Sequence, residues 1–546
     1  MNTLMKSLLV SALALSAAHV QAATNKTYLA PRPVGQNLAM EVVTFNELVD
    51  NKNEDRFGGN LQVTGFYSQS ADKAETGKYF GVNNKNSFKA QTGLPATNSV
   101  DLDASLMVHD NAGTINEAVT ISLNPSQVVW GARFDYHQDL DKLVDGLYFR
   151  AKLPVVKIEN DMELSVTSAT AAKSAIIAQH LKGTYASNSG VAGTADAQAA
   201  LTHAKIAGKQ SKTTVADFEL VLGYAFLDKD CYRAALNLGL VIPTGNVADG
   251  VHAFEAVAGN GGHWAFGAGL EFGARVWGDE QRNIKFNAQL DYRYAFEAAE
   301  KRTLGLNGIN FGQYNTVVAS AATSSNGQNY NSTTGAYTGT SPVYGAGLTS
   351  SLLAIPAANK LTMNVNVTPG SSLDFIAGLA YNHGGFSIDL GYNLNWKEAE
   401  SVARKDAWTD TSFDYINGGA PAADTGTGLS AGANYGKTTG GQISLVKVDG
   451  TGNPVWTVAA GSGNALAAIS TAEIATVFTA LPSTLVSTSA AATPSAMTNK
   501  VYGQVGYIWK NMEFPVMLGA GGHYEFASSN AAIENWGINI KAGISF

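Results

Sequence analysis

Apolar and polar residues alternate along much of the chain with a period of two. The pattern is clearest in "IKFNAQLDYRYAF", where Ile284 and every second residue up to Phe296 are apolar or aromatic and most of the intervening residues are polar. Successive side chains of a strand point to opposite faces, so this pattern predicts strands with one apolar and one polar face. Runs of about ten such residues are long enough for a tilted strand to cross a membrane.

The alternation predicts twelve strands. They are expected at 58–68, 127–137, 146–156, 216–225, 232–246, 263–277, 284–296, 373–381, 386–396, 501–509, 513–526 and 535–546. Fourteen strands are the alternative, because "AVTISL" and "MELSV" also alternate briefly. Counted as strands, these two segments add a pair; counted as extensions, they lengthen one hairpin.

The connections between these strands alternate between two kinds. Short turns are expected near 138–146, 226–230, 277–282, 383–385 and 510–512, and mostly long connections at 70–126, 168–214, 242–262, 298–371, 398–499 and 527–535. Every long connection then falls on one side of the sheet. The pattern predicts an all-β fold: a closed antiparallel transmembrane barrel with short periplasmic turns and long extracellular loops. Aromatic residues near the strand ends fit such a barrel: Tyr136, Trp396, Trp509, Tyr524, Phe526 and Trp536.

Composition supports the same class. Charged residues make up 15% of the chain, against about 25% in ordinary soluble domains, and no apolar run reaches the ~20 residues of a membrane helix. The net charge of −8 comes without a basic stripe, which argues against nucleic acid as a partner. Cys231 is the single cysteine, so a disulfide scaffold is not expected. No residue pattern predicts a metal or cofactor.

The first 22 residues have the features of a cleaved secretory signal. Lys6 precedes an apolar run, and Val20-Gln21-Ala22 is a small-x-small cleavage site. We expect cleavage after Ala22 and export to the outer membrane of a diderm bacterium.

The last strand, "NWGINIKAGISF", carries apolar residues at alternate positions and ends in an aromatic. It resembles the terminal strand of bacterial outer-membrane β-barrel proteins of the porin-like kind, which the barrel-assembly machinery recognises. The resemblance implies an assembly signal at Ile538, Ile540, Ile544 and Phe546, with Ala542 a weaker match. It also implies outer-membrane lipid and small solutes as partners and leaves the oligomeric state open.

A narrower likeness concerns "LNLGLVIPTGN", which is similar to segments of hydrophobic-compound and fatty-acid transporter barrels. Those families have an N-terminal hatch inside the barrel, and residues 23–56 have the place and length of one. This segment lacks an "NPA"-like hatch motif. It is therefore expected to be periplasmic or hatch-like, with the barrel spanning 57–546.

The long loops and the inward face bear on function. "SAIIAQHLKG", "DAQAALTHAKIAG" and "TAEIATVFTALPSTL" could each form a short helix, and one or more loops could narrow the pore. The predicted pore-lining charges are Arg133, Arg150, Lys152, Asp217, Glu219, Lys285, Asp291, Arg293, Asp374 and Asp389. They could line a wet channel or form a salt-bridged plug. In the first case, the basic residues near 133–152 would face the acidic pair Asp374 and Asp389 across the pore.

The sequence therefore predicts an outer-membrane channel for passive diffusion of small solutes. The alternatives are an outer-membrane transporter for hydrophobic compounds with an N-terminal hatch and a surface adhesin displayed on a barrel. The histidines are scattered, and no Ser/His/Asn or Asp/His set occurs at comparable heights on neighbouring strands, so no enzymatic activity is expected.

Overall fold

The computed structural model describes residues 25–37, 39, 57–91, 100–104, 107–108, 117–186, 197–229, 231–319, 329–331, 336–338, 353–405, 408, 413–416, 478–480, 483–528 and 533–546. The expected signal peptide lies outside these residues, as does most of the segment expected to be helical at 471–485. Among the described residues, no helix is long and apolar enough to cross a membrane.

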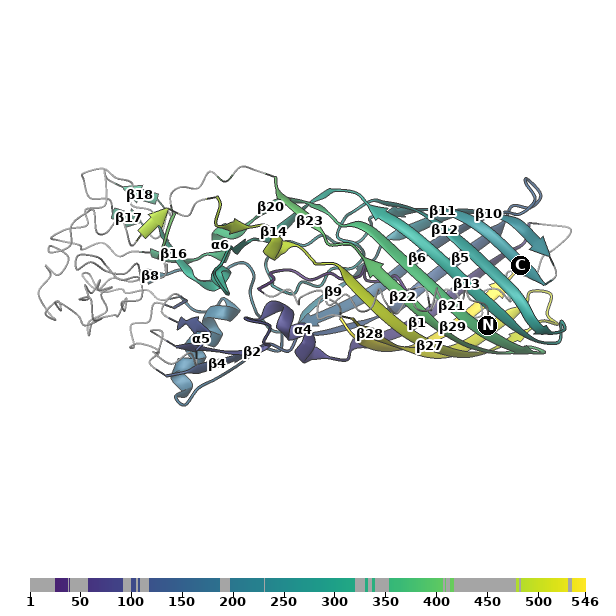
Figure 1. Ribbon diagram of the computed structural model, residues 1–546, viewed down its shortest axis with the longest axis horizontal. Helices are drawn as coiled ribbons and strands as arrows, with labels where there is room; N and C mark the ends of the chain where they lie inside the picture. The colour runs from purple at the N-terminus through teal and green to yellow at the C-terminus, as the bar shows by residue number, and fades with distance from the viewer. Residues whose placement is uncertain are drawn as a thin grey trace, which may run out of the picture.

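Twelve antiparallel strands of the described chain close into one barrel (Figure 1). Around the ring they are β1 (Gly59–Ser70), β5 (Ser126–Asp139), β6 (Leu147–Asp161), β10 (Phe218–Lys229), β11 (Tyr232–Ile242), β12 (Ala265–Gly278), β13 (Arg282–Ala295), β21 (Gly370–His383), β22 (Phe386–Lys397), β27 (Ala496–Trp509), β28 (Val516–Ala527) and β29 (Asn535–Ser545). The last strand pairs with the first along its whole length, from Asn60↔Ser545 to Ser70↔Asn535. The predicted fold class and the twelve-strand count are confirmed.

The two segments behind the fourteen-strand alternative lie outside the ring. They form β4 (Val119–Ser122) and β7 (Ser165–Thr167), which pair with each other just beyond the hairpin of β5 and β6. With β2 (Ser87–Gln91) and β3 (Leu102–Asp103) they make a separate four-stranded sheet. One further strand, β9 (Gln210–Val215), pairs with the far half of β6, while β10 pairs with the near half.

Short and long connections alternate as expected. Between barrel strands, the short connections are 140–146, 230–231, 279–281, 384–385 and 510–515. All lie at one end of the barrel, called here the turn end, and the long connections leave the opposite loop end (Figure 1). Cys231 lies in a turn at the turn end and is exposed.

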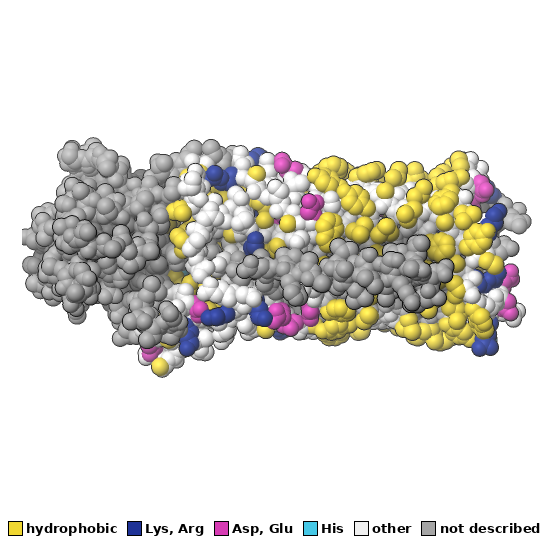
Figure 2. Space-filling view, in the orientation of Figure 1, with side chains coloured by type: hydrophobic (Ala, Val, Ile, Leu, Met, Phe, Trp, Pro, Cys, Tyr) yellow, Lys and Arg dark blue, Asp and Glu magenta, His cyan; other side chains and the backbone are white. Residues whose placement is uncertain are grey.

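The outer wall of the barrel is apolar. Leu390 and Ile540 are each 63% exposed, and Leu222, Leu238, Leu270 and Leu518 about half exposed. Figure 2 shows this yellow surface over the barrel, with charged side chains gathered at the turn end and towards the loop end. Water-soluble monomers rarely expose a continuous apolar patch larger than a few hundred Å². The wall is that of a barrel that meets lipid.

Aromatic residues border this belt at both ends. Of the six that the sequence singles out, four lie towards the loop end (Trp396, Tyr524, Phe526 and Trp536) and two towards the turn end (Tyr136 and Trp509). The ring of Phe546 stacks on Tyr136 with centroids 6.5 Å apart, and its backbone exchanges two hydrogen bonds of 2.9 Å with Gly59. The final residue therefore packs at the seam between β29 and β1.

Packed segments cover the loop end (Figure 1). They comprise α4 (Lys73–Phe80), α5 (Ala171–Lys182), β8 (Ala197–Gln198), β14 (Ala298–Thr303), β15 (Gly305–Leu306), η2 (Gly312–Tyr314), β16 (Thr316–Ala319), β17 (Asn329–Asn331), β18 (Ala336–Thr338), β19 (Leu353–Pro356), α6 (Ala358–Leu361), β20 (Thr362–Thr368), β23 (Ser401–Arg404), β24 (Phe413–Ile416), β25 (Phe478–Ala480), β26 (Val486–Ser487) and η3 (Ser489–Ala491). Two apolar clusters hold this cap together, one around Tyr79, Phe88 and Ile177 and the other around Leu361 and Val365.

One of the expected loop helices is confirmed and one is wrong. "SAIIAQHLKG" lies in α5, which ends at Gly183 with φ +75°, a left-handed conformation that glycine adopts without strain. "DAQAALTHAKIAG" contains β8 and no helix. Its backbone N–H groups donate to other segments instead, Ala204 to Gly250 and Ile206 to Leu181. Tertiary hydrogen bonds outweigh the helix propensity of this alanine-rich stretch.

Candidate functional site

The lumen of the barrel contains part of the chain that precedes β1. This N-terminal segment, residues 25–37, has no helix or regular strand. It enters from the cap, where Lys26 N donates to Tyr79 O (3.2 Å), and continues to Val34, which forms a two-way backbone bridge with Gly259 in the connection between β11 and β12. Gly259 has no room for a side chain, which would collide with the carboxylate of Asp217. The backbone contacts at Lys26 and Val34 therefore fix the segment near both ends of the described stretch.

Basic residues of the wall hold the backbone of this segment. Lys397 Nζ donates to Ala30 O (3.0 Å). Arg133 Nη1 donates to Asn37 O (3.2 Å), and Lys500 Nζ donates to the Asn37 side chain (3.3 Å). These donors come from β22, β5 and β27, so the segment contacts more than one side of the barrel.

The segment also binds acidic residues of the wall through its own Arg32. Its two terminal nitrogens bind Asp374 on β21 (3.1 Å) and Glu525 on β28 (3.0 Å). Lys500 also contacts Glu525, at 3.1 Å. Arg32 therefore links the segment to two carboxylates on separate strands.

The predicted pore-lining residues lie on the inward face of barrel strands by register, except Asp217, which directly precedes β10. Arg133, Arg150, Lys152, Asp217, Glu219, Asp291 and Asp389 are buried, and Lys285, Arg293 and Asp374 are partly buried. The outward neighbours on the same strands are mostly apolar; Phe134, Leu222, Tyr292 and Leu390 are exposed, and those on β6 are partly buried. That these charges line a solute path stays a prediction.

Most of these charges are paired inside the lumen. Arg150 makes two bonds to Glu271 (2.6 and 2.9 Å), and Glu271 also accepts from Asn237. Glu219 binds Lys152 (3.2 Å) and Arg293 (2.8 Å). Charge-assisted bonds of this kind fix the orientation of the side chains.

Arg133 and Asp374, from the two walls that were expected to oppose each other, also have ion-pair partners close by. Arg133 Nε donates to Asp135 on the same strand (2.8 Å), and Asp374 binds Arg32. The local charge of each wall is therefore largely neutralised, which brings the arrangement close to the salt-bridged alternative.

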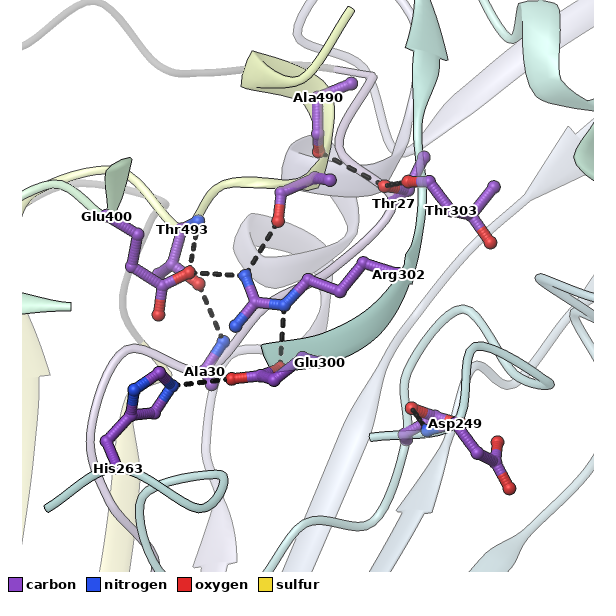
Figure 3. A network of polar contacts seen from close by, with 12 residues as sticks. Thr27, Ala30, Asp249, His263, Glu300, Arg302, Thr303, Glu400, Ala490 and Thr493 are labelled. Atoms are coloured by element: carbon purple, nitrogen blue, oxygen red, sulfur yellow. Dashed lines mark hydrogen bonds and ion pairs between the residues drawn. The ribbon is translucent and has the colours of Figure 1, made fainter. Parts of the chain in front are cut away.

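A second group of charges lies at the loop end and was missed by sequence reasoning. In this mouth cluster, Arg302 lies between Glu300 (2.8 Å) and Glu400 (2.6 Å), and His263 contacts Glu300 at 2.7 Å (Figure 3). Lys397 contacts Glu400 at 3.0 Å. "EKR" places Glu300 and Arg302 on the same face of β14, a signal that the sequence does carry. The identity of their partners depends on the folded cap.

The mouth cluster also holds the N-terminal segment. The guanidinium of Arg302 lies 3.7 Å from the ring centre of Tyr28, and Ala30 N donates to Thr493 Oγ1 (3.2 Å) beside Glu400. Burial acts to raise the pKa of Glu400, but Arg302 and Lys397 outweigh it and hold that pKa well below its usual range. Glu400 is therefore ionised, and its charge is used to bind the two cations.

A carboxyl pair lies in the connection between β11 and β12. The backbone N–H groups of Asp249 and Val251 donate to the Glu255 carboxyl group. Burial, together with the neighbouring Asp249 carboxylate, raises the pKa of Glu255 to about 8, while the hydrogen bond from Glu255 lowers that of Asp249. The two carboxyl groups therefore share one proton at neutral pH.

A cavity of about 190 Å³ runs beside the N-terminal segment. One side is apolar, with Val34, Phe66, Val129 and Ile158. The other side carries the charged residues of β21, β22, β27 and β28. The cavity has room for a small molecule that is apolar on one side and polar on the other.

His180 and His137 make structural contacts. His180 is fully buried, its Nε2 bonds to Tyr314 O (2.8 Å), and burial lowers its pKa to about 4. His137 bonds to Asp139 and accepts from Arg150. No group of three or more His, Cys, Asp or Glu in the described chain is arranged to hold a metal ion.

No protein-family model and no curated protein matches the chain. Among solved structures it is similar to an outer-membrane channel from Pseudomonas putida F1 (10% identity, TM-score 0.33, covering 91% of this chain and 99% of that one). It is also similar to the NanC porin (7% identity, TM-score 0.25, covering 89% and 98%) and to the CymD monoaromatic hydrocarbon channel (11%, 0.24, 96% and 98%). At these identities and TM-scores, the likeness identifies neither a solute nor a mechanism.

Proposed function

We propose that the protein is an outer-membrane channel that admits small solutes by passive diffusion and has no enzymatic activity. The observation that carries the proposal is the division of the barrel wall, apolar outside and charged inside. A charge that faces lipid at the bilayer midplane costs roughly 2–4 kcal/mol, so charges are expected where water or protein meets them. The apolar belt with aromatic borders supports an outer-membrane location, with the barrel-assembly machinery as partner for the terminal strand.

In this proposal, residues 23–56 act as a hatch that narrows the path. The described part of that range occupies the lumen through Arg32, Val34 and Asn37, and the cap contacts it at Tyr28. Solutes then pass through what remains of the lumen along the charged strands.

Conductance in planar bilayers tests the proposal. The purified protein should give discrete openings in KCl, and removing residues 25–37 should raise the conductance of each opening because the lumen loses an occupant. The preparation should first show heat-modifiable migration in detergent gels, since a closed strand ladder resists unfolding. A folded preparation that stays silent, with and without residues 25–37, would contradict the channel.

A second candidate function is favoured by the apolar side of the cavity. Val34, Phe66, Val129 and Ile158 offer a surface for a hydrophobic solute against the hatch. A transporter of this kind would bind an apolar fluorescent probe and give no steady openings. Val129→Asp should abolish probe binding, whereas a diffusion channel would conduct with or without the probe.

A further inference from the structure

The contacts of Arg32 define a site that the wall forms by itself. Asp374 and Glu525 come from strands separated by β22 and β27, yet both reach the same guanidinium. Their carboxylates are already oriented by neighbours. Asn393 Nδ2 donates to Asp374 Oδ1 (2.5 Å), and Thr498 Oγ1 donates to Glu525 Oε1 (2.6 Å). The barrel therefore holds both acceptors in place independently of the segment.

The charge balance of this site calls for a cation. Glu525 has a second partner in Lys500, whereas the only cation that contacts Asp374 among the described residues is Arg32. Without Arg32 the wall would present two carboxylates against one ammonium. Asn393 is 1% exposed, and its Oδ1 has no hydrogen-bond partner. Asn393 lies beside Asp374, whose cationic partner in the described chain is Arg32, and a carboxylate next to a buried acceptor without a donor favours a ligand that is positively charged and carries several N–H groups.

Arg32 fills the site incompletely. Its Nε is buried and has no hydrogen-bond partner. The cavity of about 190 Å³ adjoins its side chain, and Val34 anchors the backbone to Gly259. The Arg32 side chain therefore has space to turn aside while the segment stays in the lumen.

We propose that Asp374, Glu525 and Asn393 form a binding site for the guanidinium or primary ammonium group of a solute, which Arg32 occupies until the solute displaces it. The inference rests on the proposed channel function, because it names the class of solute that the lumen would select. N–H groups that reach both carboxylates at once distinguish such a ligand from a cation without N–H groups.

Binding is measured by calorimetry on the folded protein in detergent, with methylguanidinium as the probe. Arg32→Ala should bind the probe at least tenfold more tightly than the unaltered protein, because the internal competitor is gone. Adding Asp374→Asn, or separately Glu525→Gln, to Arg32→Ala should abolish that gain. Tetramethylammonium has the charge without N–H groups and methylurea has N–H groups without the charge, so neither should bind.

Equal affinity for methylguanidinium with and without Arg32 would overturn the site, as would equal binding of tetramethylammonium. Bilayer recordings separate this outcome from failure of the channel. Silent bilayers with tight binding by Arg32→Ala would remove the conducting function and keep the site. Steady KCl openings without any gain in binding would keep the channel and remove the site. Heat-modifiable migration confirms that each variant is folded.

Discussion

Arg302 offers the sharpest test of how the mouth cluster holds the N-terminal segment. Arg302→Met removes the guanidinium that lies between Glu300 and Glu400, both of which are buried. Removing one partner of a buried ion pair costs about 3–5 kcal/mol. Glu400 keeps Lys397 and the Thr493 N–H, and Glu300 keeps His263, so the lower value of about 3 kcal/mol applies.

Losing about 3 kcal/mol of local stability raises the equilibrium constant for opening of the cluster roughly a hundredfold. Hydrogen–deuterium exchange measures this opening directly, since the amide N–H groups of Thr27, Ala30 and Thr493 are hydrogen-bonded within or beside the cluster. These amides should exchange about a hundredfold faster in Arg302→Met. Arg302→Lys should fall between the two proteins, because an ammonium cannot fork between both carboxylates.

The matched control is Lys301→Met, which removes the same charge from the opposite face of β14, where Lys301 contacts His203. Its exchange at 27–30 should match that of the unaltered protein, and the barrel amides of β27 and β28 should stay protected in every variant. Unchanged protection in Arg302→Met would refute the reasoning, since the cluster would then not bind the segment.

Three further predictions follow from other parts of the molecule. Phe546→Asp should lower the amount of assembled barrel in the outer membrane without altering export, as membrane fractionation would show; normal assembly would mean that the seam does not need the ring. The pKa of Glu255 lies above that of the unfolded chain, so the connection 243–264 should lose stability as the pH rises from about 4.3 to about 8. Limited proteolysis should show that dependence, and Glu255→Gln should abolish it; a dependence that persists in the variant would assign it elsewhere. Changing Arg133 and Arg150 to Glu should shift the reversal potential in a salt gradient towards cations, most at low salt; a conducting variant with an unchanged potential would place both outside the path.

The barrel could be predicted because its physics is local. Alternation in "IKFNAQLDYRYAF" requires only that one face meets lipid and the other does not, and each short turn joins neighbours in the sequence. Because successive side chains of a strand point to opposite faces, the alternation also predicts which face carries each charge. Arg150 and Glu219 could therefore be assigned to the inward face from the sequence alone.

The partners of those charges could not be predicted. Arg150 binds Glu271 three strands away around the ring, and Arg302 binds Glu400 from a different loop. Such pairs depend on side-chain lengths and on how the chain crosses the lumen, and neither feature produces a repeating pattern in the sequence. The helix expected at 196–208 failed for the same reason, because distant backbone groups compete for its N–H donors.

The pairing of β29 with β1 also constrains how the molecule can form. Gly59 and Ser545 are 486 residues apart, and joining the ends of a flexible loop of that length costs about 5.5 kcal/mol of chain entropy plus a constant. The other pairings of the ring join consecutive barrel strands, so they can form as a curved sheet while both outer edges stay unsatisfied. In lipid, those bare edges would leave their peptide groups without partners. The chain therefore gains most by closing the circle in one late step, with both edges held close together beforehand.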